Sequence, residues 1–237
     1  AKHTRRKDAR PAELLAAALD LFVEKGYAAT KAEEVAARAG VSKGTLFLYF
    51  ASKEELFKAV VRENISGRFG AWSSELANYQ GNSEDLLRYG VQTWWERIGS
   101  TQASGIPKLL VAEARNFPEL AAFYEQEVMC PGMALIAHIL QRGVVRGEFA
   151  PMDPQHAVYT VIAPLFFLAI WRHSLGRCEG IANLIVPEDY LRQQVNTLLY
   201  GLCVRPVAVS QQAPSALPSP RRRGGSSSLP STRKARS

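Results

Sequence analysis

The chain has 237 residues, of which 47% are hydrophobic and 22% charged, and its net charge is +7. This composition suits one or two globular domains with a sizeable core, and the longest apolar run, residues 158–171, is too short to span a bilayer. Three isolated cysteines fit neither a disulfide framework nor a zinc site and, with a basic start that lacks an apolar signal region, favour a reduced, cytoplasmic compartment.

The first predicted elements are a basic arm and an amphipathic helix. Residues 1–10 carry five lysine or arginine side chains against one acid, Asp8, and we expect a flexible arm. Residues 11–25 place apolar side chains on one helical face, which are Leu14, Leu15, Ala18, Leu19 and Phe22. This face should pack on the helices that follow.

A capped helix follows the amphipathic one. Thr30 and Glu33 have the spacing of a capping box, in which each side chain satisfies a backbone N–H of the first turn. Val35, Ala36 and Ala39 then form one buried face. Gly40 ends the helix, because glycine tolerates the left-handed conformation that follows a helix terminus.

A second short helix, 43–50, follows after four residues, with Ser42 as its N-cap. Its geometry turns Leu46 and Phe50 inward, leaves Phe47 at the edge, and turns four residues outward, which are Gly44, Thr45, Leu48 and Tyr49. Ser52 caps a third helix, with Glu55 as its capping partner. Two short helices joined by a tight turn are typical of a helix-turn-helix.

The outward face suits a DNA groove. Gly44 permits close backbone approach, Thr45 can donate to a base edge or a phosphate, and Leu48 fits a thymine methyl. Lys43 lies at the positively polarised helix N-terminus. The residues that we expect to contact DNA are Thr30, Ser42, Lys43, Gly44, Thr45, Phe47, Leu48, Tyr49 and Lys53. The alternative is a generic helical hairpin, which would not explain three consecutive caps.

The remaining pattern is helical throughout and predicts an all-α fold of about nine helices. A long helix should run from Lys53 to about Tyr79, and further helices should cover 83–98, 104–116, 118–146, 154–175 and 188–204. Prolines predict kinks near Pro131 and at Pro164. After residue 204, a Pro-, Ser- and Arg-rich tail with seven basic and no acidic residues predicts disorder. This tail holds the whole charge excess, so net charge says little about the helix-turn-helix.

GYAAT, VAARAGVSKGTLFLYF and SKEELF resemble the TetR/AcrR (tetracycline-repressor-like) family of bacterial transcription regulators, over about residues 13–61. The resemblance implies a DNA-binding domain at 11–57 and a ligand-binding and dimerisation domain at 58–204, which lie between the basic arm at 1–10 and the tail at 205–237. It also implies a repressor dimer that a small-molecule effector releases from a near-palindromic operator on double-stranded DNA. Leu48 departs from the family pattern, since its position is more often polar or aromatic.

Two sets of residues are expected to serve the second domain. In the family, the last two helices pair with those of a second subunit, and their apolar stripes here are Val158, Ile162, Leu165, Ala169, Leu191, Val195, Leu198 and Leu202. The effector candidates are aromatic and polar residues that could line a cavity or simply form core, and they are Trp94, Trp95, Arg115, Phe117, Phe123, Tyr124, Met129, His138, Phe166, Phe167, Trp171 and His173.

Two other functions were weighed. A helix-turn-helix protein controlled by a protein partner would have a filled core, without a cavity of roughly 300 Å³. An enzyme is disfavoured because the chain lacks a Ser/His/Asp or Cys/His set, a glycine-rich phosphate loop and metal-ligand spacing. We therefore expect no enzymatic activity, no cofactor and no membrane association.

Overall fold

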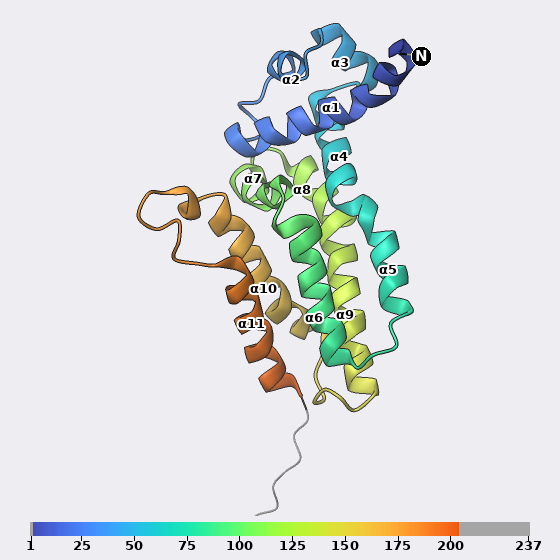
Figure 1. Ribbon diagram of the computed structural model, residues 1–237, viewed down its shortest axis with the longest axis vertical. Coiled ribbons are helices and arrows are strands. Elements are labelled where there is room, and N and C mark those ends of the chain that lie inside the picture. Colours follow the sequence, from blue (N-terminus) through green and yellow to red (C-terminus); the bar gives the residue numbers. More distant parts are fainter. Residues whose placement is uncertain (1, 204–237) are drawn as a thin grey trace, which may run out of the picture. The chain divides into compact units, whose positions relative to one another are not determined.

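The computed structural model describes the backbone of residues 2–203 and the side chains of residues 10–203 (Figure 1). This part of the chain is all-α, as expected, and one isolated bridge pairs Phe149 with Cys203. Its α-helices are α1 Lys2–Lys25, α2 Ala32–Arg38, α3 Lys43–Tyr49, α4 Lys53–Asn64, α5 Phe69–Ala77, α6 Ser83–Trp94, α7 Ile106–Glu113, α8 Pro118–Tyr124, α9 Cys130–Val145, α10 Pro154–Arg172 and α11 Pro187–Leu202.

The arm and the tail predicted at the two ends of the chain are covered unequally by the structure. Residues 2–10, expected as a flexible arm, instead continue α1 backward through Pro11. A proline inside a helix forfeits one backbone hydrogen bond, and here the helix continues past it. The side chains of residues 1–9 and the whole tail at 205–237 lie outside the described residues, so the predictions made for them stand as predictions.

Helices α1 to α4 form what we call the head, residues 10–64. In Figure 1, α1, α2 and α3 gather at one end of the described residues, and α4 leads from them toward the other helices. Phe22, Leu46 and Phe57 are fully buried in the core of the head. Rings of Phe22 and Phe57 meet edge to face at 5.4 Å between centroids, a favourable aromatic geometry. The head is therefore a packed unit that holds α3 rigidly.

The long helix expected from Lys53 to Tyr79 is two helices with a break at Ile65. The backbone of Ile65 leaves the helical region, with φ −129° and ψ −76°, and a short 3-10 turn, η1 (Ser66–Arg68), follows. Asn64 contributes to the break because its side-chain amide donates to the Val60 carbonyl at 2.8 Å. Gly67 fits closely there, since a Cβ would lie 2.6 Å from the Arg62 carbonyl oxygen. The expected boundary at residue 57/58 falls inside α4.

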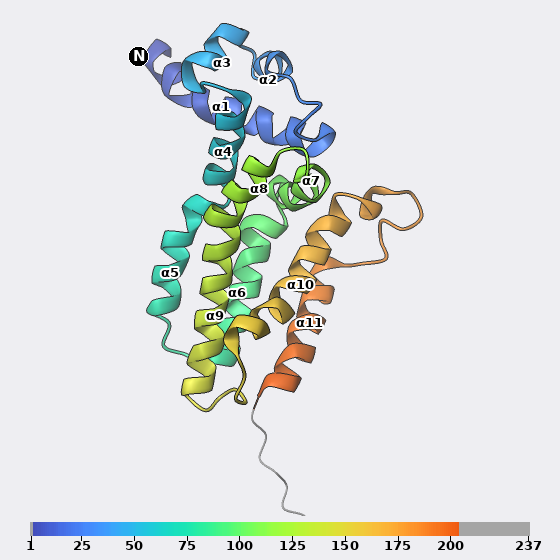
Figure 2. The same ribbon diagram turned by 180° about the vertical axis from the view of Figure 1, so that it is seen from behind.

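Helices α6, α9, α10 and α11 form the second core, with Leu86, Leu140 and Leu168 fully buried. Figure 2 shows α9 running beside α6, with α10 and α11 on one side and α5 on the other. The structure has two π-helical turns: η2, Trp95–Gly99, ends α6, and η4, Glu125–Met129, joins α8 to α9. The second turn lies just before Pro131, where a kink was expected, because proline cannot donate to a carbonyl one turn earlier.

Two helical segments, 118–145 and 154–177, have the length and composition of a membrane span, each with a mean hydropathy of 1.4. These properties are shared with core helices. Here the segments supply Ile139, Leu140 and Leu168 to the second core. The sequence analysis counted only the uninterrupted apolar run at 158–171, and the two helical segments are longer because they include residues on either side of such runs.

Candidate DNA-binding surface and ligand cavity

The cap of α3 is built as the sequence predicts. The Ser42 hydroxyl accepts the Thr45 backbone N–H at 3.1 Å, and the two hydroxyls lie 2.9 Å apart. One hydroxyl hydrogen joins the pair, so the other stays available for a base or a phosphate. Leu46 is fully buried, whereas Leu48 is 84% exposed. The inward and outward faces of α3 are therefore confirmed at their two leucines.

The neighbours of Leu48 complete the exposed surface. The ammonium of Lys43 lies 2.5 Å from a Glu33 carboxylate oxygen and 5.8 Å from the centre of the half-exposed Phe47 ring. Gly44 is exposed, with ordinary room for a Cβ. Tyr49 was expected to point outward, yet it is half-buried and packs against the head core. It therefore offers less surface than Leu48 does.

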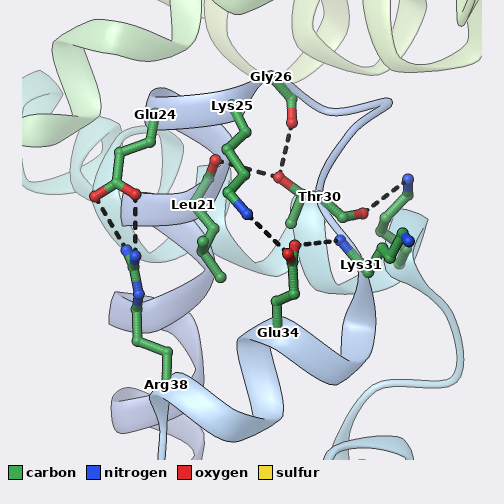
Figure 3. Close-up of polar contacts among 9 residues, drawn as sticks. Leu21, Glu24, Lys25, Gly26, Thr30, Lys31, Glu34 and Arg38 are labelled. Atoms are coloured by element: carbon green, nitrogen blue, oxygen red, sulfur yellow. Dashed lines mark hydrogen bonds and ion pairs between the residues drawn. The ribbon is translucent and has the colours of Figure 1, made fainter.

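Thr30 was expected both to cap α2 and to contact DNA, and the structure corrects both roles. The side chain is 1% exposed, and its hydroxyl lies 2.7 Å from the Gly26 carbonyl oxygen and 3.2 Å from that of Leu21 (Figure 3). The hydroxyl therefore holds the end of α1 together. A side chain buried and bonded in this way has no free donor for a phosphate.

The start of α2 lies one residue later than expected. The N-cap is Lys31, whose backbone N–H donates to the Glu34 carboxylate at 3.3 Å, so Glu34 takes the role foreseen for Glu33. Glu34 also accepts from the Lys25 ammonium of α1 at 2.7 Å, and the Arg38 guanidinium donates two hydrogen bonds to the Glu24 carboxylate of α1 (Figure 3). These pairs fasten α2 to α1, and the hydrogen bonds from Lys25 and from the Lys31 backbone N–H lower the pKa of the Glu34 carboxyl below its usual range.

Lys53 was expected to contact a phosphate, but its ammonium is used inside the head. It donates to the carbonyl oxygens of Tyr27, Ala28 and Thr30, at 3.0, 3.3 and 3.2 Å. It also lies 4.4 Å from the centre of the Tyr27 ring. Partial burial lowers the pKa of Lys53, and the nearby Glu113 opposes that shift. Lys53 therefore fixes the loop between α1 and α2 and is withdrawn from the phosphate contacts.

A cavity of about 450 Å³ lies among α5, α6, α9 and α10, a typical size for a small-molecule site. Of the effector candidates, Trp94, Tyr124, Met129 and Phe166 line it. Sequence reasoning missed other parts of the wall, among them Phe69, Trp72, Tyr89, Thr93 and Tyr159. Two of these, Phe69 and Trp72, lie on α5, which the sequence pattern presented as part of a connecting helix.

The other effector candidates lie elsewhere. Trp95 donates to Glu188 at 3.1 Å, Phe117 packs edge to face on Tyr27, and Phe167 neighbours Trp171. The remaining ones are exposed or belong to other packing, and they are Arg115, Phe123, His138 and His173. Aromatic identity alone therefore did not separate cavity wall from core.

The stripes expected at a dimer interface are largely used within one subunit. Five of their eight residues are buried, which are Val158, Leu165, Ala169, Leu191 and Val195. Ile162, Leu198 and Leu202 are half-buried. The outward face of α10 instead carries Tyr159, which is 57% exposed, Phe166 and Phe167. An apolar stripe shows that a helix face is covered, and here α10 packs on α9 and α11, while α11 packs on α10 and α6.

A buried polar cluster joins the cavity wall to the head. Ser104, in the 3-10 turn η3 (Gln102–Gly105), lines the cavity, and its hydroxyl lies 2.9 Å from Nε2 of the buried His173. Nδ1 of this imidazole lies 3.1 Å from the Arg177 guanidinium. Burial, with help from Arg177 and Arg172, lowers the pKa of His173 to about 4. The imidazole is therefore neutral at physiological pH.

Two models of protein families match the chain. The N-terminal model, "Bacterial regulatory proteins, tetR family", matches residues 14–60, and "Tetracyclin repressor-like, C-terminal domain" matches residues 80–177. The HTH-type transcriptional regulator RutR of Escherichia coli K12 is 28% identical over 176 residues, 68% of this chain and 74% of RutR.

Two further comparisons agree. An uncharacterized HTH-type transcriptional regulator of Mycobacterium bovis is 37% identical over 141 residues, 60% of this chain and 66% of that protein. The crystal structure of NalD, a secondary repressor of a multidrug efflux pump in Pseudomonas aeruginosa, superposes with a TM-score of 0.59 at 21% identity. That comparison covers 83% of this chain and 98% of NalD and shows the shared fold. The chain belongs to the tetR family of bacterial regulatory proteins and is a DNA-binding transcriptional regulator.

Proposed function

We propose that this regulator is a dimeric repressor that leaves a near-palindromic operator when a small molecule enters the cavity. The observation that carries the proposal is the exposed face of α3 on a packed head, in which Thr30 and Lys53 are bonded internally. Leu48, Lys43 and Gly44 are free to approach a major groove there. The protein would act in the cytoplasm, where the chromosome lies.

The proposed DNA contacts are fewer than those read from the sequence. Leu48 and Thr45 would meet base edges, and Lys43 would meet a phosphate after exchanging its ion pair with Glu33. Exposed ion pairs are weak, so this exchange has a low cost. Ser42, Phe47 and Tyr49 would support the same face. Thr30 and Lys53 are excluded by their internal bonds.

A dimer would place two copies of α3 on one face of the DNA, about 34–36 Å apart. The surface that we propose for this contact is the exposed aromatic part of α10, which consists of Phe167 and of Tyr159 and Phe166, two residues that also line the cavity. Large apolar side chains gathered on one exposed face are typical of an interface. A two-fold dimer requires a near-palindromic operator.

The cavity reaches the elements that carry the head. Ile65, at the break after α4, lines it, and so does Ser104, whose turn η3 packs against α1. Arg62 of α4 also grips Glu127 of η4, at 2.7 Å, and η4 contributes Met129 to the wall. An effector that prefers a different spacing of these elements would shift both heads, and a coupling of about 1–3 kcal/mol is typical.

Control by a protein partner alone fits less well. A regulator of that kind would have a filled second core, whereas this one has a cavity of about 450 Å³. The cavity therefore supports a small-molecule effector.

The test is selection of DNA by the full chain from a randomised duplex library, followed by fluorescence anisotropy at several salt concentrations. We expect one near-palindromic site that binds two subunits. Binding to all sequences alike, or a selected site without two-fold symmetry, would contradict the proposal.

A further inference from the structure

The wall of the cavity is almost entirely apolar and aromatic. Phe69, Trp72 and Trp94 contribute rings, and leucine, isoleucine and methionine side chains of α6, α9 and α10 fill most of the rest. Burial of apolar ligand surface is favourable in such a site, by roughly 25 cal/mol per Å². The wall is therefore suited to a ligand with a large apolar body.

The one ionised side chain among the described residues of the wall is already paired. Glu75 accepts two hydrogen bonds from the Arg97 guanidinium, both at 3.1 Å, and one from the Tyr89 hydroxyl, at 2.9 Å. Arg97 and Tyr89, in that order, lower the pKa of the Glu75 carboxyl. The pair leaves no charge for a ligand ion to meet. A charged ligand group would thus lose its water without gaining a partner, which disfavours its binding.

The wall does offer hydrogen-bond donors. Within the part of the chain that the structure describes, no side chain or carbonyl accepts from the hydroxyls of Thr93 and Tyr124 or from the Trp94 indole N–H. Burial raises the pKa of the Tyr124 hydroxyl, so this group stays protonated and able to donate. A donor that lines the cavity without a protein acceptor can pair with an acceptor atom of a bound ligand.

We propose that the effector is an uncharged, mostly apolar molecule with at least one hydrogen-bond acceptor, such as a ketone, ester or ether oxygen, that meets Tyr124 or Thr93. This inference rests on the proposed function, because it names the class of molecule that fills the same cavity. It excludes organic anions and cations as preferred ligands.

The test uses the full chain and displacement of N-phenyl-1-naphthylamine, an uncharged apolar fluorophore. Three competitors share one chain length and differ in charge, namely decan-2-one, decanoate and decylammonium. We expect decan-2-one to displace the fluorophore at a concentration about tenfold or more below the other two. Equal or better displacement by either ion, or no binding of the fluorophore, would overturn the proposal.

The variants Tyr124→Phe and Thr93→Val keep the shape of the wall and remove a donor each. We expect at least one of them to lower the affinity for decan-2-one by about threefold or more, while the affinity for the fluorophore changes less than about twofold. Tyr190→Phe and Thr160→Val are matched controls outside the wall and should change neither value. If both wall variants behave like their controls, the acceptor part of the proposal is wrong.

A parallel anisotropy titration with the selected duplex separates the two proposals. If decan-2-one binds but DNA affinity stays constant, the proposed release mechanism fails and the ligand class stands. If DNA binding is sequence-specific but an ion is the preferred ligand, the ligand class fails alone.

Discussion

In the head, polar side chains such as Lys53 and Thr30 are hydrogen-bonded within the fold. Along the cavity wall, in contrast, several donors have no acceptor in the described chain. Lys53 holds three carbonyl oxygens and Thr30 holds two, so both are spent on the shape of the head. Tyr124 and Thr93 line the cavity without such bonds. The DNA-reading face of α3 thus rests on side chains whose hydrogen bonds are all made within the head. The cavity wall keeps hydrogen-bond donors that remain open to a ligand. Four experiments test this contrast.

The largest effect should come from acid titration of His173, where the head and the cavity wall meet. Its pKa of about 4 in the fold lies below the unfolded value near 6.5, so the unfolded chain binds the proton first. Stability is therefore complete above pH 6.5 and is lost as the pH falls toward 4, by roughly 3 kcal/mol. Urea unfolding at several pH values measures the loss.

The groups that face His173 are Ser104 of η3, Arg172 of α10, Arg177 of the 3-10 turn η5 (Leu175–Arg177) and Lys108 of α7. The three cations oppose its protonation. His173→Gln should make stability less dependent on pH between 4 and 6.5. An unchanged pH profile of His173→Gln would contradict this origin.

The next effect is expected for Lys53→Met, which removes the bonds to the loop after α1. The free energy of unfolding should fall by about 2 kcal/mol, because three bonds to a charged donor are lost. DNA affinity should fall with it, while the slope of affinity against salt stays unchanged. A slope lower by about 0.9 would mean that Lys53 does contact a phosphate.

Leu48→Ala should spare the fold and impair base reading. The side chain is exposed, so stability should stay within about 0.5 kcal/mol of the wild type. Affinity for the selected site should fall by about tenfold if Leu48 covers a thymine methyl.

Each thymine of the selected site is then replaced in turn by uracil, which lacks the methyl group, and the affinity of each duplex is measured for the wild type and for Leu48→Ala. At one position the wild type should lose affinity and Leu48→Ala should lose none. Equal losses at every position would assign Leu48 no base.

The smallest effect is expected for Lys43→Met, the counterpart of the Lys53 variant. Lys43 is exposed at the start of α3, so its loss should leave stability unchanged and lower the salt slope by about 0.9. Titration of DNA binding between 50 and 200 mM salt measures this. An unchanged slope would mean that Lys43 does not contact a phosphate and that other cations position the head on the DNA.

The contrast also explains what the sequence could predict. The cap at Ser42 and the faces of α3 depend on residues within one turn, so local spacing is sufficient. The destination of Lys53 depends on carbonyls 23 to 26 residues away, and nothing in its own helix indicates them. The prediction for Thr30 was wrong for a similar reason, because its hydroxyl donates to carbonyl oxygens at the end of α1.

The second part of the chain was predictable only in outline. The helices and the π turn before Pro131 follow from periodicity and proline. The stripes of α10 and α11 indicated covered faces correctly, but the pattern cannot tell a neighbour in the same subunit from one in another. The break at Ile65 also escaped, because Asn64 and Gly67 act on the backbone through contacts that periodicity does not record.

Gly105 gives this arrangement a mechanical consequence. A single added Cβ there would lie 2.5 Å from Cγ1 of Val23 in α1 and 3.0 Å from Nδ1 of His173. The clearance between the DNA-reading end and the wall of the cavity is therefore smaller than one methyl group. No free space separates the two elements at this point. A movement of the cavity wall toward α1 would therefore displace α1 as well.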